Sequence, residues 1–299
     1  MTTHAAEFPT ATTQVIIEIA LDEDLGPARA LDVTTLATIP ADQTTTARVV
    51  ARAPGVVAGL PVIRMVLDAV TARLGGDGVD VQIAIDDGTA VSRGDVIATV
   101  TGPTRAILIA ERTLLNLLSR VSGVASHTRR WMDALRGTGC VVLDTRKTTP
   151  GLRALEKYAV RVGGGRNKRM GLFDVAMIKD NHKRAAGSIT AAFERIRQEF
   201  PDVPVEVEVT TTAEAVEAVE AGARFLLLDN FSPDALAHAV STVRRTGERV
   251  ELEATGGLTL EVAREFAMTG VDYLSVGGLT HSSPILDIAL DIALDIVPG

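Results

Sequence analysis

The sequence of 299 residues holds a single cysteine, Cys140. One cysteine excludes an internal disulfide framework and any metal site built from several cysteines, and it favours a reducing cytoplasm as the location. Long hydrophobic runs are also missing. No stretch of about 18 residues is apolar and free of charge, so no membrane span is expected. The first 15 residues, MTTHAAEFPTATTQV, lack the basic start and apolar run of a signal peptide.

Positive charge is scarce over the whole chain. There are 30 Lys and Arg against 38 Asp and Glu, a formal net charge of -8, which argues against a nucleic-acid partner. The cations are nevertheless clustered, because residues 144–184 hold 11 of the 30 cations and 4 of the 38 acids. An acidic body with one basic segment is typical of a protein that concentrates a small, highly charged anion, although a solvated basic surface would look the same.

The first hundred residues have the pattern of an α+β domain. Residues 14–25 show helical spacing, and residues 46–59 indicate two strands around an Ala-Pro-Gly turn. Pro61 opens a helix that runs to about Leu74, and residues 79–85 alternate like a strand. A long helix then follows over residues 105–135, with a break expected near Gly123.

After Gly139 short apolar runs alternate with helical patterns. The runs are CVVLD (140–144), VAMIKD (175–180), VEVEV (205–209), FLLLD (225–229), VELEA (250–254) and DYLSVGG (272–278). Alternating strands and helices predict a parallel sheet, and six units favour a closed barrel over an open sheet. The stretch GGGRNKRMG (163–171) follows a helix and lacks the spacing of a dinucleotide-binding loop.

Charged residues close almost every one of these runs. They are Asp144, Lys179 with Asp180, Glu208, Asp229 and Glu253. In α/β barrels the carboxyl ends of the strands form the mouth of the active site, so we expect these side chains to meet there. Glu208 and Asp229, on adjacent strands, suit Mg²⁺, which takes few carboxylates and keeps positions for substrate phosphates. Sugar hydroxyls would suit the same pair.

Glycine pairs and cations accompany the carboxylates. ATGGL (254–258) and VGGLTH (276–281) each follow a strand, where free backbone N–H groups can bind phosphate, although simple turns also use glycine. Arg146, Lys147, Arg169 and Lys179 exceed the needs of one monophosphate and indicate a diphosphate with a carboxylated partner. A lysine at a strand end, such as Lys179, could instead form a Schiff base.

Several of these motifs together resemble the quinolinate phosphoribosyltransferase family. The core resemblance lies in DTRKTTPGLRALEKYAVRVGGG, NKRMGL and IKDNH. In the same order, LDEDLGPARALDVTT, AERTLLNLLSRVSGVA, EVEV, LLLDNF, EATGGL and DYLSVGGLTHS extend it over about residues 15–290. The resemblance implies a type II phosphoribosyltransferase-like fold: an N-terminal α/β sandwich domain (1–120) and an open α/β barrel of about six to seven parallel strands (121–284). The segment 285–299 is a candidate to pack on the first domain.

The resemblance also implies the activity and the roles of residues. Family members join quinolinate to phosphoribosyl pyrophosphate with Mg²⁺, release pyrophosphate and CO₂, and form nicotinate mononucleotide for NAD synthesis. They are homodimers or larger homo-oligomers with active sites shared between subunits. The residues implied to bind the pyridine dicarboxylate are Arg146, Arg169 and, from the other subunit, Arg112. Those implied at the pyrophosphate, ring, ribose and metal are Lys147, Lys179, Glu208 and Asp229. Those implied at the 5′-phosphate are Thr255, Gly256, Gly257, Gly277, Gly278 and His281. Further substrate-binding candidates are Thr145, Lys168, Glu253 and Val276.

One position departs from the family pattern. Asn167-Lys168-Arg169 stands where Asn-His-Arg is usual, and the His there contacts the substrate carboxylate. This departure leaves open a related phosphoribosyltransferase for another aromatic acid. A Schiff-base lyase that uses Lys179, or a non-catalytic module that binds sugar phosphates, remains as an alternative of another class.

Overall fold

The computed structural model describes residues 7–26 and 32–293. By its contacts the chain forms two compact units. The first unit comprises residues 1–127, 149–164 and 282–299, and the second comprises residues 128–148 and 165–281. The domain boundaries taken from the sequence, near residues 120 and 284, stay a prediction. The outer ends of those ranges, residues 1–6 and 294–299, lie outside the described residues.

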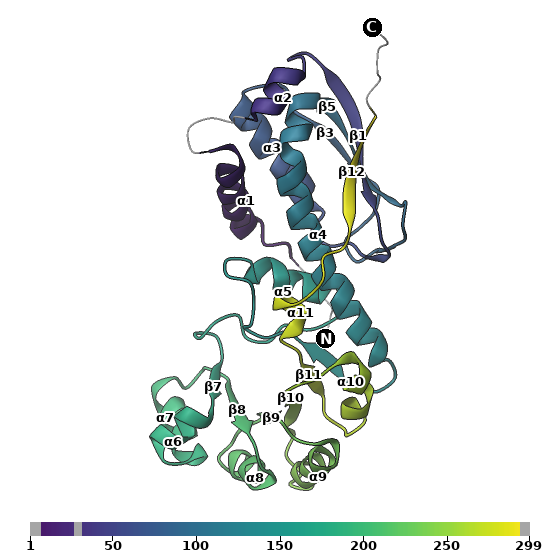
Figure 1. Cartoon of the computed structure of the whole chain (residues 1–299). Coiled ribbons are helices and arrows are strands. Elements are labelled where there is room, and N and C mark those ends of the chain that lie inside the picture. The colour runs from purple at the N-terminus through teal and green to yellow at the C-terminus, as the bar shows by residue number, and fades with distance from the viewer. Residues whose placement is uncertain (1–6, 27–31, 294–299) are drawn as a thin grey trace. The chain divides into compact units, whose positions relative to one another are not determined.

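The first unit is built on an antiparallel sheet of order β12-β1-β5-β3. Its strands are β1 (Thr44–Ala51), β3 (Asp80–Ile83), β5 (Val96–Pro103) and β12 (Ile288–Ala293), beside a small pair of β2 (Gly55–Val56) and β4 (Ala90–Val91). Its helices are α1 (Thr10–Leu25), α2 (Val33–Thr38), α3 (Pro61–Leu74), α5 (Arg153–Val162) and most of α4 (Thr104–Ala134). The late strand β12 lies beside the early strand β1 (Figure 1), so the end of the described chain completes this sheet.

Local sequence explains the limits of α3 and the course of α4. Pro61 occupies the first turn of α3, and Gly75 ends it in the left-handed conformation at φ 68°. The expected break of α4 near Gly123 is wrong, because α4 runs unbroken. A methyl group at Gly123 would lie 2.1 Å from the backbone oxygen of Pro284. The glycine therefore serves close backbone packing and not a kink.

The second unit carries a six-stranded parallel sheet of order β6-β11-β10-β9-β8-β7. The strands are β6 (Val141–Leu143), β7 (Ala176–Ile178), β8 (Val205–Val209), β9 (Phe225–Asp229), β10 (Glu251–Thr255) and β11 (Tyr273–Ser275). The helices are α6 (Asp180–Ala186), α7 (Ile189–Glu199), α8 (Thr212–Glu220), α9 (Pro233–Arg244), α10 (Leu260–Ala267) and α11 (Gly278–His281). Helices α7, α8 and α9 follow one another along one side of this sheet (Figure 1).

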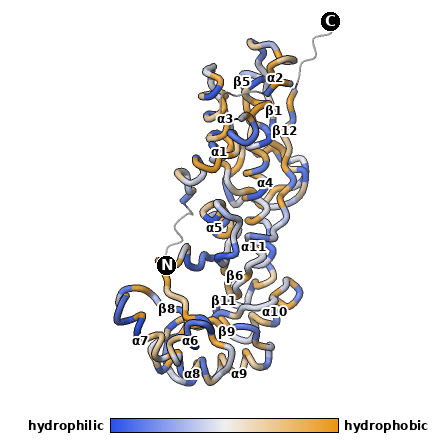
Figure 2. Tube along the Cα trace, turned by 60° about the vertical axis from the view of Figure 1, so that its left-hand side comes forward, coloured by the Kyte–Doolittle hydropathy of each residue, from blue (hydrophilic) through white to orange (hydrophobic). Residues whose placement is uncertain are grey.

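The helices of this unit have one packed face, and its strand β8 alternates between apolar and acidic residues. Hydrophobic and hydrophilic residues are interspersed along α7, α8 and α9 (Figure 2), as expected for helices with one packed face. Hydroxyl side chains cap their amino ends, with Ser188, Thr211 and Ser232 each accepting a backbone N–H bond. In β8 the two glutamates share one face by the period of two, opposite the valines.

The sheet is open, as the resemblance implies, and the closed barrel expected from the strand pattern is wrong. Among the described strands, β6 and β7 are the two edges and do not pair with each other. The free edge of β6 instead bridges to Arg166, whose N–H donates to the Val142 carbonyl at 3.0 Å. The glycine-rich loop is thereby attached beside β6. No helix in the described ranges is long and apolar enough to cross a membrane.

Candidate active site

A cavity of about 450 Å³ lies in the second unit among the carboxyl ends of the strands. Ten of the residues predicted from the sequence line it: Thr145, Arg146, Lys147, Lys168, Arg169, Lys179, Glu208, Asp229, Glu253 and Thr255. Met177, Leu227 and Ser275 complete the wall. The volume suits a small organic ligand with several charged groups. The predicted cations and carboxylates are thus gathered in one place.

Two arginines, Arg146 and Arg169, bring positive charge to the wall of this cavity. Burial, followed by repulsion from the Arg146 guanidinium, lowers the pKa of Arg169. The buried Nε of Arg146 has no hydrogen-bond partner among the described residues. Arg169 donates one bond of 3.2 Å to the Val175 carbonyl. Two crowded, partly desolvated guanidinium groups would both be stabilised by a bound carboxylate or phosphate.

Asp144 holds the glycine-rich loop that carries one of these arginines. Its buried carboxylate accepts bonds from the Asn167 amide at 2.6 Å and from the Lys168 backbone N–H at 2.8 Å. A carboxylate that receives two donors inside the protein fixes the backbone that donates to it. The charge at the end of β6 thus supports the cavity wall, and Asp144 does not itself line the cavity.

Lys168 and two glutamates form a buried ionic cluster under the cavity. The Lys168 Nζ lies 2.6 Å from Glu253 and 3.4 Å from Glu206. Burial, only partly offset by Lys168, raises the pKa of Glu206. The expected place of Glu253 at the end of its strand is wrong, because β10 continues to Thr255 and Glu253 is fully buried. Glu206 was missed from the sequence, although alternation in VEVEV puts it on the same face as Glu208.

Three charged groups meet at the ends of β7, β8 and β9. The Lys179 Nζ lies 2.7 Å from a carboxylate oxygen of Glu208. Burial, reinforced by the Glu208 carboxylate, raises the pKa of Asp229. Two carboxylates that repel each other fit a divalent cation, which takes its remaining ligands from substrate or water. Within the described residues, no cluster of three or more His, Cys, Asp or Glu side chains could hold a metal ion alone.

The turn after β10 is shaped by its glycines. Gly256 and Gly257 have φ of 103° and 58°. A methyl group at Gly256 would lie 2.1 Å from Oδ1 of Asn230, whereas the space around Gly257 is open. Asn230 itself has φ 57° and donates to the Asp229 carboxylate at 2.9 Å. This asparagine, missed from the sequence, links the glycine turn to the carboxylate end of β9.

The turn after β11 carries the other glycine pair. A methyl group at Gly277 would lie 2.8 Å from Cδ of Lys147 and 3.4 Å from Nε2 of His281. Gly278 opens the short helix α11, and the Val276 N–H pairs with the Leu143 carbonyl at 3.0 Å. The predicted residues of both turns that do not line the cavity wall are Gly256, Gly257, Val276, Gly277, Gly278 and His281.

Arg112 is the predicted residue that belongs to the first unit. It lies on α4 with 66% of its side chain exposed. Its nearest acidic partner is Glu111, at 3.9 Å, which is too long for a strong ion pair. Arg112 does not line the cavity of its own chain.

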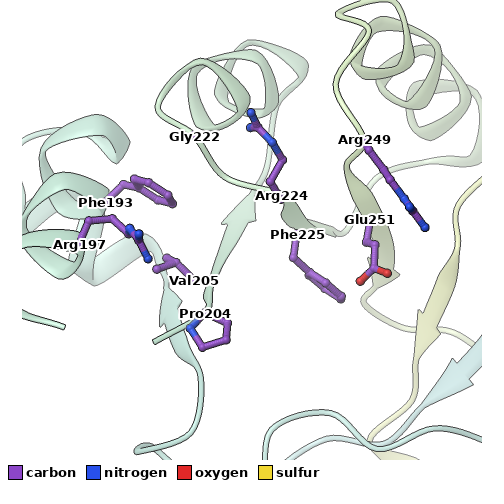
Figure 3. Close-up of a pocket in the computed structure, with 9 residues that line it drawn as sticks. All are labelled: Phe193, Arg197, Pro204, Val205, Gly222, Arg224, Phe225, Arg249 and Glu251. Atoms are coloured by element: carbon purple, nitrogen blue, oxygen red, sulfur yellow. The ribbon is translucent and has the colours of Figure 1, made fainter. Parts of the chain in front are cut away.

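A larger cavity, of about 650 Å³, lies at the opposite, amino ends of β8, β9 and β10. Arg197, Arg224 and Arg249 line it beside Phe193 and Phe225 (Figure 3). Arg224 is already paired with Glu248 at 2.8 Å. None of the predicted site residues lines this cavity, and chemistry in parallel barrels takes place at the carboxyl ends of the strands. The smaller cavity is therefore our candidate active site.

Known proteins resemble this chain over most of its length. Family models described as the N-terminal and C-terminal domains of quinolinate phosphoribosyl transferase match residues 32–122 and 124–291. A nicotinate-nucleotide pyrophosphorylase (carboxylating) of Mycobacterium leprae is 48% identical over 276 residues, covering 92% of this chain and 95% of the relative. The probable Bacillus subtilis enzyme of that name is 42% identical, with 85% of each chain covered.

Solved structures are similar over nearly the whole length. The nicotinate-nucleotide pyrophosphorylase of Francisella tularensis has a TM-score of 0.88 at 34% identity, covering 98% of this chain and 100% of that one. NadC of Streptococcus pyogenes has a TM-score of 0.89 at 35% identity, with 97% and 99% covered. With both family models matched in order, this chain belongs to the quinolinate phosphoribosyl transferase family.

Proposed function

We propose that this chain transfers the phosphoribosyl group of phosphoribosyl pyrophosphate to quinolinate with loss of CO₂. The products are nicotinate mononucleotide and pyrophosphate, which places the enzyme in de novo NAD synthesis, and we propose that it works in the cytoplasm. The observation that carries the proposal is the Arg146 and Arg169 pair. Two crowded guanidinium groups, one with an unpartnered buried Nε, match a ligand that brings two carboxylates.

The other groups of the cavity suit the sugar diphosphate. Glu208 and Asp229 would hold Mg²⁺, which when bound supplies positive charge to the pyrophosphate oxygens. Lys147 and Lys179 line the same cavity and would stabilise the negative charge that develops on the leaving pyrophosphate. The glycine turns after β10 and β11 offer backbone N–H groups to the 5′-phosphate.

The chemical steps need charge stabilisation more than proton transfer. The pyridine nitrogen attacks C1 of the ribose as pyrophosphate leaves, through a centre with oxocarbenium character. The ring nitrogen then carries a positive charge, which stabilises the carbanion left when the adjacent carboxylate departs as CO₂. This carbanion takes up a proton from water, and the ring becomes that of nicotinate mononucleotide. Arg146 and Arg169 orient the ring for both steps. No side chain is assigned as general base.

The Schiff-base alternative has little support in the geometry. Lys179 lies 2.7 Å from Glu208, and an amine that attacks a carbonyl would have to leave this ion pair. Four cations besides the buried Lys168 line the cavity, which exceeds the need of a lyase or of a module that binds one sugar phosphate. These alternatives therefore remain outcomes of the test below.

The test is pyrophosphate release by the purified chain with phosphoribosyl pyrophosphate, Mg²⁺ and either quinolinate or nicotinic acid. We expect release with quinolinate, loss of release on chelation of Mg²⁺, and loss in an Asp229→Asn variant. Release with nicotinic acid alone would point to a related phosphoribosyltransferase with another acid substrate. Borohydride-trapped adducts on Lys179 would favour the Schiff-base alternative.

We also propose that the chain is a homodimer, or a larger homo-oligomer, whose sites are completed by Arg112 of a second subunit. The exposed, weakly paired Arg112 supports this proposal. Mixing an Arg112→Ala protein with an Arg169→Ala protein should restore activity, because one site in each mixed dimer is intact. Absence of activity despite demonstrated subunit exchange would contradict a shared site.

A further inference from the structure

The ammonium of Lys168 is surrounded by its own protein. The side chain is only 5% exposed, although it reaches the floor of the cavity. Two oxygens of Glu253 lie 2.6 and 2.7 Å from Nζ, and Glu206 lies at 3.4 Å. The ring centroid of Phe225 lies 5.7 Å from the Lys168 Nζ. These groups satisfy a buried lysine by ion pairs and by cation–π contact.

Charge balance around Lys168 sets it apart from the arginines. One ammonium faces two buried carboxylates, so it adds no surplus positive charge for a ligand. Arg146, in contrast, has a buried Nε without a partner among the described residues. A carboxylate entering the cavity therefore meets available donors on the arginines but would compete with Glu253 for Lys168.

The cluster also spans the open sheet. Lys168 follows the loop segment that bridges to β6, and its backbone N–H is fixed by Asp144 at 2.8 Å. Its side chain reaches Glu253 on β10 and Glu206 on β8. Lys168 thereby connects the loop at one edge of the sheet to two interior strands. The next residue of the same loop, Arg169, lines the cavity.

We propose that Lys168 is a positioning residue, committed to Glu253 and Glu206, and that Arg146 and Arg169 bind the carboxylates of the ligand in its place. The inference rests on the proposed function and names the side chains that recognise the acid. It follows that the departure from histidine at this position leaves the acid substrate unchanged.

Four full-length proteins test the proposal. They are the wild type, Lys168→Met, the pair Glu206→Gln with Glu253→Gln, and the combination of all three substitutions. Quinolinate dissociation constants are measured by calorimetry, with KM, kcat and the unfolding midpoint for each protein. Glu253 also lines the cavity, so its substitution can affect the ligand directly. The loss of quinolinate affinity caused by Lys168→Met is therefore compared between two backgrounds, the wild type and the protein with both glutamines.

We expect Lys168→Met to weaken quinolinate binding about tenfold or more in the wild type, because two buried carboxylates lose their cation. In the background with both glutamines, the same substitution should weaken quinolinate binding clearly less. The triple variant, whose cluster is neutral, should have an unfolding midpoint near that of the wild type. An equal cost in both backgrounds would mean that Lys168 contacts the ligand directly and would overturn the proposal. Arg146→Lys is the comparator, with an equal loss of quinolinate affinity expected in both backgrounds.

The proposal can be tested even if the variants that leave an unequal charge in the cluster do not fold. If Lys168→Met does not fold, the neutral triple variant is compared with the wild type alone. A quinolinate dissociation constant within about tenfold of the wild type then supports the positioning role, and a larger rise contradicts it. A wild-type protein that neither binds nor converts quinolinate would instead overturn the proposed function, while the unfolding midpoints would still report whether Lys168 is coupled to the glutamates.

Discussion

The buried carboxylate of Asp144 accepts the backbone N–H of Lys168 at 2.8 Å and thereby joins the end of β6 to the glycine-rich loop. The next residue of that loop is Arg169, which lines the cavity. A charge expected at the mouth of the active site thus binds the backbone of the loop. A buried carboxylate therefore supports the loop that carries Arg169.

Asp144→Asn should weaken this support. The two donors reach different oxygens of the carboxylate, and asparagine replaces one of these oxygens by an NH₂ group, so one buried donor loses its acceptor. We expect a loss of about 1 to 3 kcal/mol in the free energy of unfolding, measured in urea, and a raised KM for quinolinate. Asp202→Asn, at an exposed position, is the control. Equal stability of Asp144→Asn and the control would contradict this role.

Gly256 and Gly257 form a matched pair. Gly256→Ala places a methyl group against Asn230 at φ 103°, whereas Gly257→Ala meets open space at φ 58°. We expect Gly256→Ala to cost about 1 to 3 kcal/mol of unfolding free energy, and to raise the Mg²⁺ concentration for half-maximal activity because Asn230 contacts Asp229. Gly257→Ala should cost less in both measurements. Equal effects of the two substitutions would refute this description of the turn.

Arg146→Lys tests whether the planar guanidinium group matters. Lysine keeps the charge but loses the forked donors, including the buried Nε. We expect kcat/KM for quinolinate to fall. The fall should correspond to a loss of roughly 2 to 5 kcal/mol in transition-state stabilisation, the range for disrupting a buried charge pair. Arg195→Lys, at an exposed position, should leave the kinetics unchanged. Wild-type kinetics in Arg146→Lys would remove this arginine from acid recognition.

The reactivity of the Cys140 thiol tests whether this residue is buried in the second unit. Burial, reinforced by the Asp272 carboxylate, raises the pKa of its thiol to about 12. Since the thiolate is the reactive form, roughly one thiol in ten thousand is ionised at pH 8. We expect no reaction of the native protein with a disulfide reagent at pH 8, and one thiol per chain after unfolding in urea. Stoichiometric reaction of the native protein would contradict the burial.

Hydrophobic spacing was sufficient to predict most elements of the fold. The six parallel strands and α3 lie where the pattern indicated them. The sheet is open because its edge strands β6 and β7 do not pair with each other, and no local sequence pattern encodes whether two distant strands pair. Gly123 was misjudged for the same reason, because its neighbour Pro284 is far away in the sequence.

The sequence predicted which charged residues gather at one cavity, but not how deeply each of them is buried. Ten of the residues singled out by strand ends and motifs line one cavity. Whether a charged side chain faces the ligand or lies beneath it depends on its depth in the sheet. Glu253 lies inside β10 and Lys168 turns toward it, so both belong to the supporting cluster, together with Glu206. Composition cannot distinguish that cluster from the exposed wall.

The most direct measurement is the ratio of the two released products. Purified protein receives phosphoribosyl pyrophosphate, Mg²⁺ and quinolinate that is isotopically labelled in the carboxylate next to the ring nitrogen, and pyrophosphate and labelled CO₂ are followed together. We expect equal amounts of both products, and neither product when Mg²⁺ is chelated. Pyrophosphate release without labelled CO₂, or silence with quinolinate despite tight binding of phosphoribosyl pyrophosphate, would contradict it.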